Sequence, residues 1–444
     1  MGQVDHSFAA ASESVAVHAL AKACELVVVV RLVNMSAIAL AYGEPVAQRL
    51  RVDLASKAAA MADVLGAAAW SGEDLEMVIA DADGFREKLD CVGANDLVLA
   101  HEVERRLRGR FFADQNQEVI PCLVTIARDI ESEDDADEVL DAARRLAFTR
   151  QPDIPDLSRD RQAVAQYRRD MAAAVLAVEL AANGGLALLW QPVASLDRSA
   201  DEDEVLYWEG LTRLVDSNGQ MCLPSSFIPA LERLGLVRVL DAYNVSQTLS
   251  RLERDPSLTL GCNISAQSVL LDGWWAEIIS RLQSDRTLAQ RLVLEITESA
   301  SFPGISLAVD FVDHFRRLGC RIAIDDFGVG HAAFRYIAAL QPDIVKIDAL
   351  FLRRAASGDS AQDHAAFKYL VGLAGSYAAV VVVEGIEHEA AAAVARDAGA
   401  IWGQGYHFGQ PSRCLIGRQM PTTPLMPPVS ARGGFGQGDL LRAI

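Results

Sequence analysis

Eight short apolar runs, separated by stretches with helical periodicity, fill the second half of the chain. They lie at residues 186–190, 205–208, 258–264, 292–296, 321–324, 344–347, 380–383 and 400–402. Strands that alternate with helices over roughly 230 residues are typical of a (β/α)8 barrel. The sequence therefore predicts an α/β protein with a C-terminal TIM-like (β/α)8 barrel, in which reactive groups lie at the carboxyl ends of the strands.

Acidic, amide and lysine side chains stand at or just after the ends of these runs. They are Glu209, Asn263, Glu295, Asp325, Asp326, Lys346, Glu384, Glu387 and Gln404. An isolated Asp-Asp-Phe-Gly could be no more than a capped turn, but acids at several strand ends favour a shared site. Carboxylates that face one opening lose hydration and repel one another, and a cation relieves both effects.

The ligand types indicate which cation this would be. Oxygen ligands suit Mg²⁺ or Mn²⁺, and none of these positions carries a histidine, which argues against zinc. Two ions about 3.5–4 Å apart can clamp a phosphodiester and activate water. Lys346 could hold that water or neutralise developing charge. The residues alone therefore predict a metal-dependent phosphohydrolase.

Composition limits the partners and the compartment. The length of 444 residues predicts two domains, and the formal charge of −19 argues against a DNA or RNA polymer as a partner. Seven scattered cysteines indicate a reducing compartment. No signal peptide is evident, and the apolar run at 26–30 ends at Arg31, far short of a membrane span. We therefore expect a cytoplasmic protein with no membrane partner.

The first half alternates strand-like and helical patterns. We expect strands at 26–30, 75–79 and 119–127, and helices at 44–69, 95–109 and 136–147. This order predicts a smaller α/β sandwich of about 125 residues in front of the barrel. The helical period at 159–182 predicts a helix that joins the two domains or packs within the second.

These patterns divide the chain into five parts. We expect an N-terminal segment at 1–24, the α/β sandwich at 25–150, a linker with the start of the connecting helix at 151–168, the barrel at 169–415, and a flexible Pro- and Gly-rich tail at 416–444.

The second half resembles an EAL domain, the phosphodiesterase that opens cyclic di-GMP to linear 5′-pGpG. The resemblance covers about 168–412 and consists of separate motifs in family order: Gln191-Pro192, Glu209-Gly210-Leu211-Thr212-Arg213, Phe227-Ile228-Pro229, Asn263-Ile264-Ser265, Glu295-Ile296-Thr297-Glu298, Asp325-Asp326-Phe327-Gly328, Lys346-Ile347-Asp348, Glu384-Gly385-Ile386-Glu387 and Gln404-Gly405-Tyr406.

The resemblance implies a role for each matching residue. Metal ligands would be Glu209, Asn263, Glu295, Asp325, Asp326 and Glu384, with Mg²⁺ or Mn²⁺ bound as two ions per barrel. Lys346, Glu387 and Gln404 would act with Glu209 in catalysis, by positioning water and ligands. Substrate contacts would come from Gln191, Leu211, Arg213 and Asp348. Glu298 would anchor the loop after Phe327, and the barrel would form a homodimer.

Two departures from the family pattern leave a second hypothesis open. The signature alanine is Gly210, and the usual Thr-Gly-Tyr-Ser-Ser after Gly328 is replaced by Val-Gly-His-Ala-Ala at 329–333. Because the family uses that loop near its metals and its dimer interface, the change favours the alternative of a catalytically weak cyclic di-GMP receptor or scaffold that acts through protein–protein interaction.

The first half resembles a degenerate GGDEF domain, the diguanylate cyclase module. The resemblance rests on the run at 27–30 followed by Gly43, and on Ser71-Gly72-Glu73-Asp74-Leu75 in place of the signature Gly-Gly-Asp-Glu-Phe. The family's metal-binding aspartate is Arg31 here, and its guanine-reading asparagine is Ala39.

These two replacements imply a domain that is inactive as a cyclase and serves regulation or dimerisation. The residues at 72–74 could still bind GTP, which would make the chain a GTP-responsive phosphodiesterase. Arg31 and Ala39 argue against that alternative.

Overall fold

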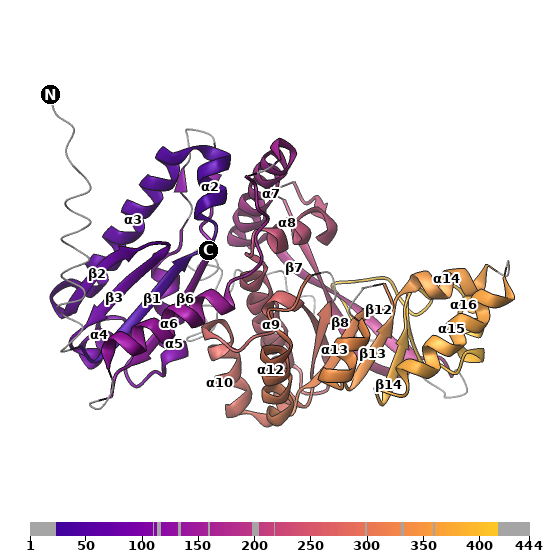
Figure 1. Ribbon diagram of the computed structural model, residues 1–444. Helices are drawn as coiled ribbons and strands as arrows, with labels where there is room; N and C mark the ends of the chain where they lie inside the picture. Colours follow the sequence, from indigo (N-terminus) through magenta and orange to yellow (C-terminus); the bar gives the residue numbers. More distant parts are fainter. Residues whose placement is uncertain are drawn as a thin grey trace.

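The computed structural model describes residues 24–109, 111–112, 117–131, 135–158, 160–197, 204–216, 218–297, 300–329, 333–357 and 360–415. It contains an N-terminal unit, from β1 to α6, and a barrel, with helix α7 (Arg161–Leu180) between them (Figure 1). Within these residues no helix is both long and apolar enough to span a membrane. The expected tail at 416–444 and nearly all of the expected segment at 1–24 lie outside the described residues.

The N-terminal unit is an antiparallel sheet covered by helices. Its strand order is β2 (Gly66–Ser71), β3 (Asp74–Ile79), β1 (Leu26–Leu32) and β6 (Leu123–Asp129). The helices are α2 (Met35–Tyr42), α3 (Glu44–Ala62), α4 (Ala82–Lys88), α5 (Asp96–Leu107) and α6 (Ala136–Arg150), and a separate ribbon pairs β4 (Phe111–Phe112) with β5 (Glu118–Val119). Strand β1 is buried on both faces, because Val28 and Val30 enter one core cluster while Val27 and Val29 enter another with α6.

Two expected elements of this unit were wrong in part. The helix expected at 44–69 ends with α3, and residues 66–71 form strand β2. The alanines there favour a helix, but Asp63 has a positive φ of 47° and the following residues pair with β3. The strand expected at 119–127 is interrupted, because Asn34 hydrogen-bonds the carbonyl of Ile120 and the amide of Cys122.

The barrel closes through eight strands in the order β10, β11, β12, β13, β14, β15, β7 and β8, with β8 also paired to β10. The strands are β7 (Leu186–Ser195), β8 (Val205–Val215), β10 (Leu260–Ser265), β11 (Leu292–Thr297), β12 (Arg321–Phe327), β13 (Ile344–Ile347), β14 (Val380–Val383) and β15 (Trp402–Gln404), and β9 (Met221–Cys222) extends β8. Helices outside the strands are α8 (Ile228–Arg233), α9 (Val237–Arg254), α10 (Ala276–Ser284), α11 (Arg286–Ala289), α12 (Ile305–Leu318), α13 (Ala333–Leu340), α14 (Ala349–Ala356), α15 (Ala361–Ala374) and α16 (Glu389–Asp397).

The predicted TIM-like barrel is confirmed, with one strand reversed. Strand β7 runs antiparallel to both of its neighbours, β8 and β15, whereas the other barrel pairings are parallel. Consequently Gln191 and Glu209 face each other in the middle of their strands rather than at strand ends. The reason is length: few residues separate β7 from β8, and antiparallel strands need no helical crossover.

Helix α7 contacts both units, as expected of a connecting helix. On the N-terminal side, Tyr167 receives a hydrogen bond from Asn34, and Arg168 donates to the carbonyl of Ala41. On the barrel side, Asp170 accepts two hydrogen bonds from Arg233 of α8, at 2.7 and 2.8 Å. The helix therefore joins the two units through buried and partly buried polar contacts as well as through its apolar face.

Candidate active site

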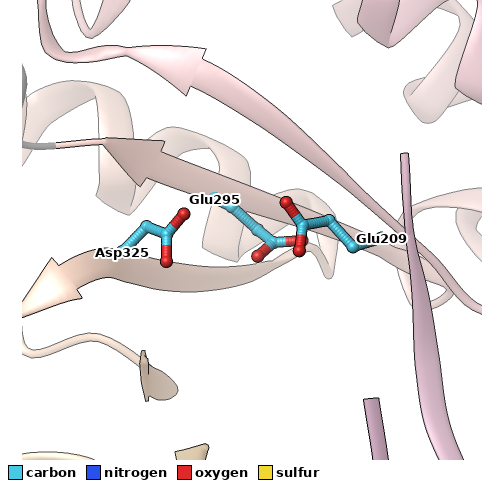
Figure 2. Close-up of side chains that lie close together, drawn as sticks. All are labelled: Glu209, Glu295 and Asp325. Carbon is cyan, nitrogen blue, oxygen red and sulfur yellow. The ribbon is translucent and has the colours of Figure 1, made fainter. Parts of the chain in front are cut away.

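A cavity of about 490 Å³ lies at the mouth of the barrel. It is lined by predicted site residues, namely Gln191, Glu209, Leu211, Asn263, Asp325, Asp326, Glu384, Glu387 and Gln404. Helices α8 and α9 supply another wall, and the segments after β14 and β15 contribute further residues. Figure 2 shows the carboxylates of Glu209, Glu295 and Asp325 gathered from separate strands.

The strand period explains how the sequence brings these side chains together. Side chains two positions apart on a strand share a face, and each of several site residues follows a buried residue by two positions. The earlier residues form one packed layer in the barrel interior: Tyr207, Val293, Ala323, Ile344 and Val382. The site residues Glu209, Glu295, Asp325, Lys346 and Glu384 therefore stand as a polar layer above a packed one.

Lys346 lies at the centre of the polar layer and is fully buried. Its Nζ is 2.8 Å from Glu295 Oε2, 2.8 Å from Glu384 Oε1, 3.0 Å from Glu209 Oε2 and 3.2 Å from Asp325 Oδ1. A single ammonium thus bridges carboxylates from four strands or strand ends. This ion-pair cluster fixes the positions of the acids relative to one another.

Glu209 is held by amide donors in addition to Lys346. Asn263 Nδ2 donates to Glu209 Oε1, and Gln404 Nε2 donates to Glu209 Oε2. Gln404 also donates to Gln191 Oε1 at 3.3 Å. Four predicted site residues therefore form one hydrogen-bonded chain across β7, β8, β10 and β15.

Asp325 and Asp326 reach the same site because strand β12 is irregular. Adjacent residues of a regular strand point to opposite faces, but the register of β12 with β13 shifts between Ile324 and Phe327. Asp326 adopts a positive φ of 56°, an uncommon conformation for a residue with a side chain. Asp325, Asp326 and Glu384 each present an oxygen within 4.8 Å of the others.

The charges in this layer do not balance. Burial would raise the pKa of Glu209, but Lys346 and the two amide donors lower it, whereas burial raises the pKa of Glu295 to about 8. Burial and then repulsion from Asp325 raise the pKa of Asp326 to about 7. Burial opposes the charge of Lys346, yet the surrounding carboxylates raise its pKa well above the usual range. One ammonium is therefore too little positive charge for the acids around it.

The side chains present fit divalent cations. Glu209, Glu295 and Asp325 form a second group whose oxygens lie within 4.8 Å of one another. In the part of the chain that the structure describes, Glu295 Oε1 and Asn263 Oδ1 are buried and accept no hydrogen bond. Carboxylate and amide oxygens without nitrogen or sulfur ligands suit Mg²⁺ or Mn²⁺.

Some predicted residues lie outside the cavity lining. Arg213 donates to the carbonyl of Thr212, and Asp348 caps α14 by accepting from the amide of Leu350 at 2.7 Å. Neither of the two lines the cavity. Glu298 and the altered positions 330–332 lie outside the described residues. Of the altered loop, Val329 is exposed and Ala333 begins α13.

Pattern arguments missed three buried polar residues of the cavity wall, namely Glu232 of α8 and Asp241 and Asn244 of α9. Asp241 accepts from the Ser265 amide and from the Ser268 hydroxyl, and burial raises its pKa to about 7. Asn244 donates to Thr212 Oγ1 at 2.9 Å. Polar residues three apart in a helix share a face, and this spacing was the available signal.

The structure also shows what Arg31 does in the N-terminal unit. Its guanidinium makes two parallel hydrogen bonds with Asp74, of 2.8 and 2.9 Å, across the paired strands β1 and β3. The β2 to β3 turn contains Gly72 at a positive φ of 62°, so the degenerate signature is a hairpin. The acid at this hairpin is therefore neutralised by a neighbouring side chain.

The EAL domain family model matches residues 174–411, more than half of the chain. The N-terminal unit precedes the matched region. The match begins within α7 and contains every strand of the barrel.

Curated relatives match about half of the chain. Cyclic di-GMP phosphodiesterase PdeF of Escherichia coli (strain K12) is 30% identical over 210 residues, which are 46% of this chain and 28% of the relative. Cyclic di-GMP phosphodiesterase PdeB of Shewanella oneidensis is 27% identical over 51% of this chain and 26% of the relative. The chain thus spans about a quarter of the length of these relatives. Among solved structures, the Pseudomonas aeruginosa FimX EAL domain bound to c-di-GMP gives a TM-score of 0.48 at 24% identity, over 55% of this chain and 97% of that chain.

Proposed function

Because the chain belongs to the EAL domain family, we propose that it is a phosphodiesterase that hydrolyses cyclic di-GMP to linear 5′-pGpG with divalent metal. The observation that carries the proposal is the layer of acids and amides around the buried Lys346, at a cavity of about 490 Å³. The relatives PdeF and PdeB are named as cyclic di-GMP phosphodiesterases, which supports the substrate.

In this proposal the reaction opens one of the two phosphodiester bonds. A water oxygen forms a bond to phosphorus, the bond from phosphorus to the 3′ oxygen breaks, and that oxygen leaves with a proton. Mg²⁺ or Mn²⁺, as two ions per barrel, would supply Lewis acidity and a nucleophile at neutral pH, held by Glu209, Asn263, Glu295, Asp325, Asp326 and Glu384.

The other residues position the reactants. Lys346 orients the attacking water or neutralises charge that develops on the phosphate. Glu387 and Gln404 orient water and ligands. The dinucleotide is contacted by Gln191, Leu211, Arg213 and Asp348.

For the N-terminal unit we propose a regulatory role without cyclase activity. An arginine cannot ligate a cation, and Arg31 already satisfies the carboxylate of Asp74. Calorimetric titration with GTP tests the alternative of a GTP-responsive enzyme. We expect no heat of binding and no change in cyclic di-GMP turnover, whereas activation by GTP would contradict this role.

The decisive experiment measures conversion of cyclic di-GMP to 5′-pGpG by purified protein with Mg²⁺ or Mn²⁺. A Glu209→Ala variant is the control for the acid layer, and a Tyr377→Ala variant, at a partly exposed position of the barrel, is the control for substitution as such. Product from the wild type and from Tyr377→Ala, but not from Glu209→Ala, supports the proposal.

Binding of cyclic di-GMP without product in either metal would instead make the chain a receptor or scaffold. The altered loop after Gly328 is the feature that favours this second function. We also propose that the barrel forms a homodimer, which light scattering of the purified protein tests directly. A monomer at micromolar concentration would contradict it.

A further inference from the structure

The packed layer beneath the acids contains one hydroxyl group among its described members, that of Tyr207. Tyr207 precedes Glu209 by two positions on β8, so both side chains point into the barrel. The ring is buried to 1% exposure and packs with apolar residues of the neighbouring strands. The hydroxyl donates to Glu295 Oε2 at 3.2 Å. A plain core residue at this position would need no such group.

This hydrogen bond acts on one oxygen of Glu295. Oε2 receives the Tyr207 hydroxyl and lies 2.8 Å from Lys346 Nζ. Oε1 accepts no hydrogen bond from any residue that the structure describes, although it is buried. The two donors therefore fix the carboxylate with one oxygen occupied and the other oxygen available.

Gly261 of β10 provides the space that this arrangement needs. A Cβ atom on Gly261 would lie 2.1 Å from Glu295 Oε1 and 2.6 Å from Tyr207 Cε2. Both distances are far below van der Waals contact, so no side chain fits at this position without moving Tyr207 or Glu295. The glycine and the tyrosine thus complement each other under the acid layer.

We propose that Tyr207 is a positioning residue that holds Glu295 so that its second oxygen is presented to a divalent cation in the acid layer. The inference rests on the proposed function, because it assigns a cation to that layer. Residues that hydrogen-bond a metal ligand orient it, and their loss typically weakens metal binding about 10- to 100-fold. Tyr207 belongs to none of the motifs that identify the site.

The test measures Mn²⁺ affinity by calorimetry without substrate, for the wild type and for Tyr207→Phe. The substitution removes the hydroxyl and keeps the ring, so packing is preserved. We expect the dissociation constant for Mn²⁺ to rise about 10-fold. We also expect the Mn²⁺ concentration for half-maximal hydrolysis to rise by the same factor, with a smaller loss of kcat at saturating Mn²⁺.

Tyr167→Phe is the matched control, because it also removes a buried, hydrogen-bonded hydroxyl, here at α7. It should leave Mn²⁺ affinity unchanged. A second variant, Gly261→Ala, places a methyl group against Glu295 and Tyr207 and should weaken Mn²⁺ binding as well.

Unchanged Mn²⁺ affinity in Tyr207→Phe would overturn the inference and leave Tyr207 as a packing residue. Loss of the fold in Tyr207→Phe, seen by circular dichroism, would also overturn it, because the hydroxyl would then serve stability. If the wild type binds Mn²⁺ but does not hydrolyse cyclic di-GMP, the proposed function fails while the affinities still decide the role of Tyr207. Absence of Mn²⁺ binding by the wild type would overturn both.

Discussion

Replacing Lys346 by methionine tests how the acid layer is held together. The side chain keeps its length and its fit in the barrel, but it loses the charge that contacts four carboxylates at 2.8–3.2 Å. Removing one partner of a buried ion pair costs about 3–5 kcal/mol, because the remaining charge is left uncompensated. For a domain of this size each kcal/mol lowers the melting temperature by about 2–4 °C. The metal-free variant should therefore melt roughly 6–20 °C below the wild type.

Divalent cations should partly reverse this loss. Mn²⁺ in the acid layer would supply positive charge that the methionine cannot, so the difference in melting temperature should narrow when EDTA is replaced by Mn²⁺. Mn²⁺ should not restore hydrolysis of cyclic di-GMP by Lys346→Met, because Lys346 is also proposed to position water. The assay is thermal unfolding by circular dichroism in EDTA and in Mn²⁺, beside turnover measurements.

Lys88→Met is the matched control. Lys88 makes one partly exposed ion pair with Asp63 at 3.2 Å, and such a pair is worth up to about 1 kcal/mol. It should shift the melting temperature little in either condition. If Lys346→Met had the same melting temperature as the wild type in EDTA, the acid layer would not depend on this ammonium for stability. The electrostatic reasoning would then be wrong.

Three further predictions concern other parts of the chain. Arg31→Ala leaves the buried Asp74 without its partner. The free energy of unfolding of the N-terminal unit, measured with urea, should therefore fall by about 3–5 kcal/mol. Incubation of this variant with GTP should still give no cyclic di-GMP. Gly210→Ala should lower stability by about 1–3 kcal/mol in thermal unfolding, because its Cβ would lie 3.0 Å from Trp190 Cζ3. The double variant with Trp190→Phe should recover part of this loss. Burial lowers the pKa of His101 from 6.5 to about 4. As the pH falls, the unfolded state therefore binds the proton before the folded state does. The protein should lose up to about 3 kcal/mol of stability between about pH 6.5 and pH 4. Urea midpoints at pH 7.5 and 4.5 should therefore differ less in His101→Phe than in the wild type.

The barrel strands could be predicted because parallel strands buried on both faces consist of short apolar runs. The apolar runs do not indicate whether a strand is parallel or antiparallel to its neighbours. Strand β7 has the composition of the other barrel strands, yet it is antiparallel to its neighbours, and pairing direction depends on contacts that are distant in sequence. Strand β2 was missed because its alanines favour a helix by local propensity. Its pairing with β3 overrides that propensity and makes it a strand.

Gly210 shows what a departure from a family pattern does not reveal by itself. The space that the signature methyl group would take is narrow here, because a Cβ atom on Gly210 would lie 3.0 Å from Trp190 Cζ3 of the paired strand β7. The side chain on the paired strand therefore approaches this position closely, and little space is left empty. A residue-by-residue comparison with a family pattern cannot detect such contacts, because the neighbouring residue lies outside the motif.

The polar layer of the site was accessible to motif reasoning, whereas the layer beneath it was not. Motifs mark residues that would contact metal or substrate, such as Glu209 and Glu295, and they omit the residues that hold these in place. The strand period nevertheless helps to find the second layer, because two positions before each acid or lysine of the polar layer stands a residue of the packed layer. Applied to β8 this rule leads from Glu209 to Tyr207, a polar residue among apolar ones. Because a buried hydroxyl needs a partner, the rule alone points to a hydrogen bond with the acid layer, and the structure identifies Glu295 as its acceptor.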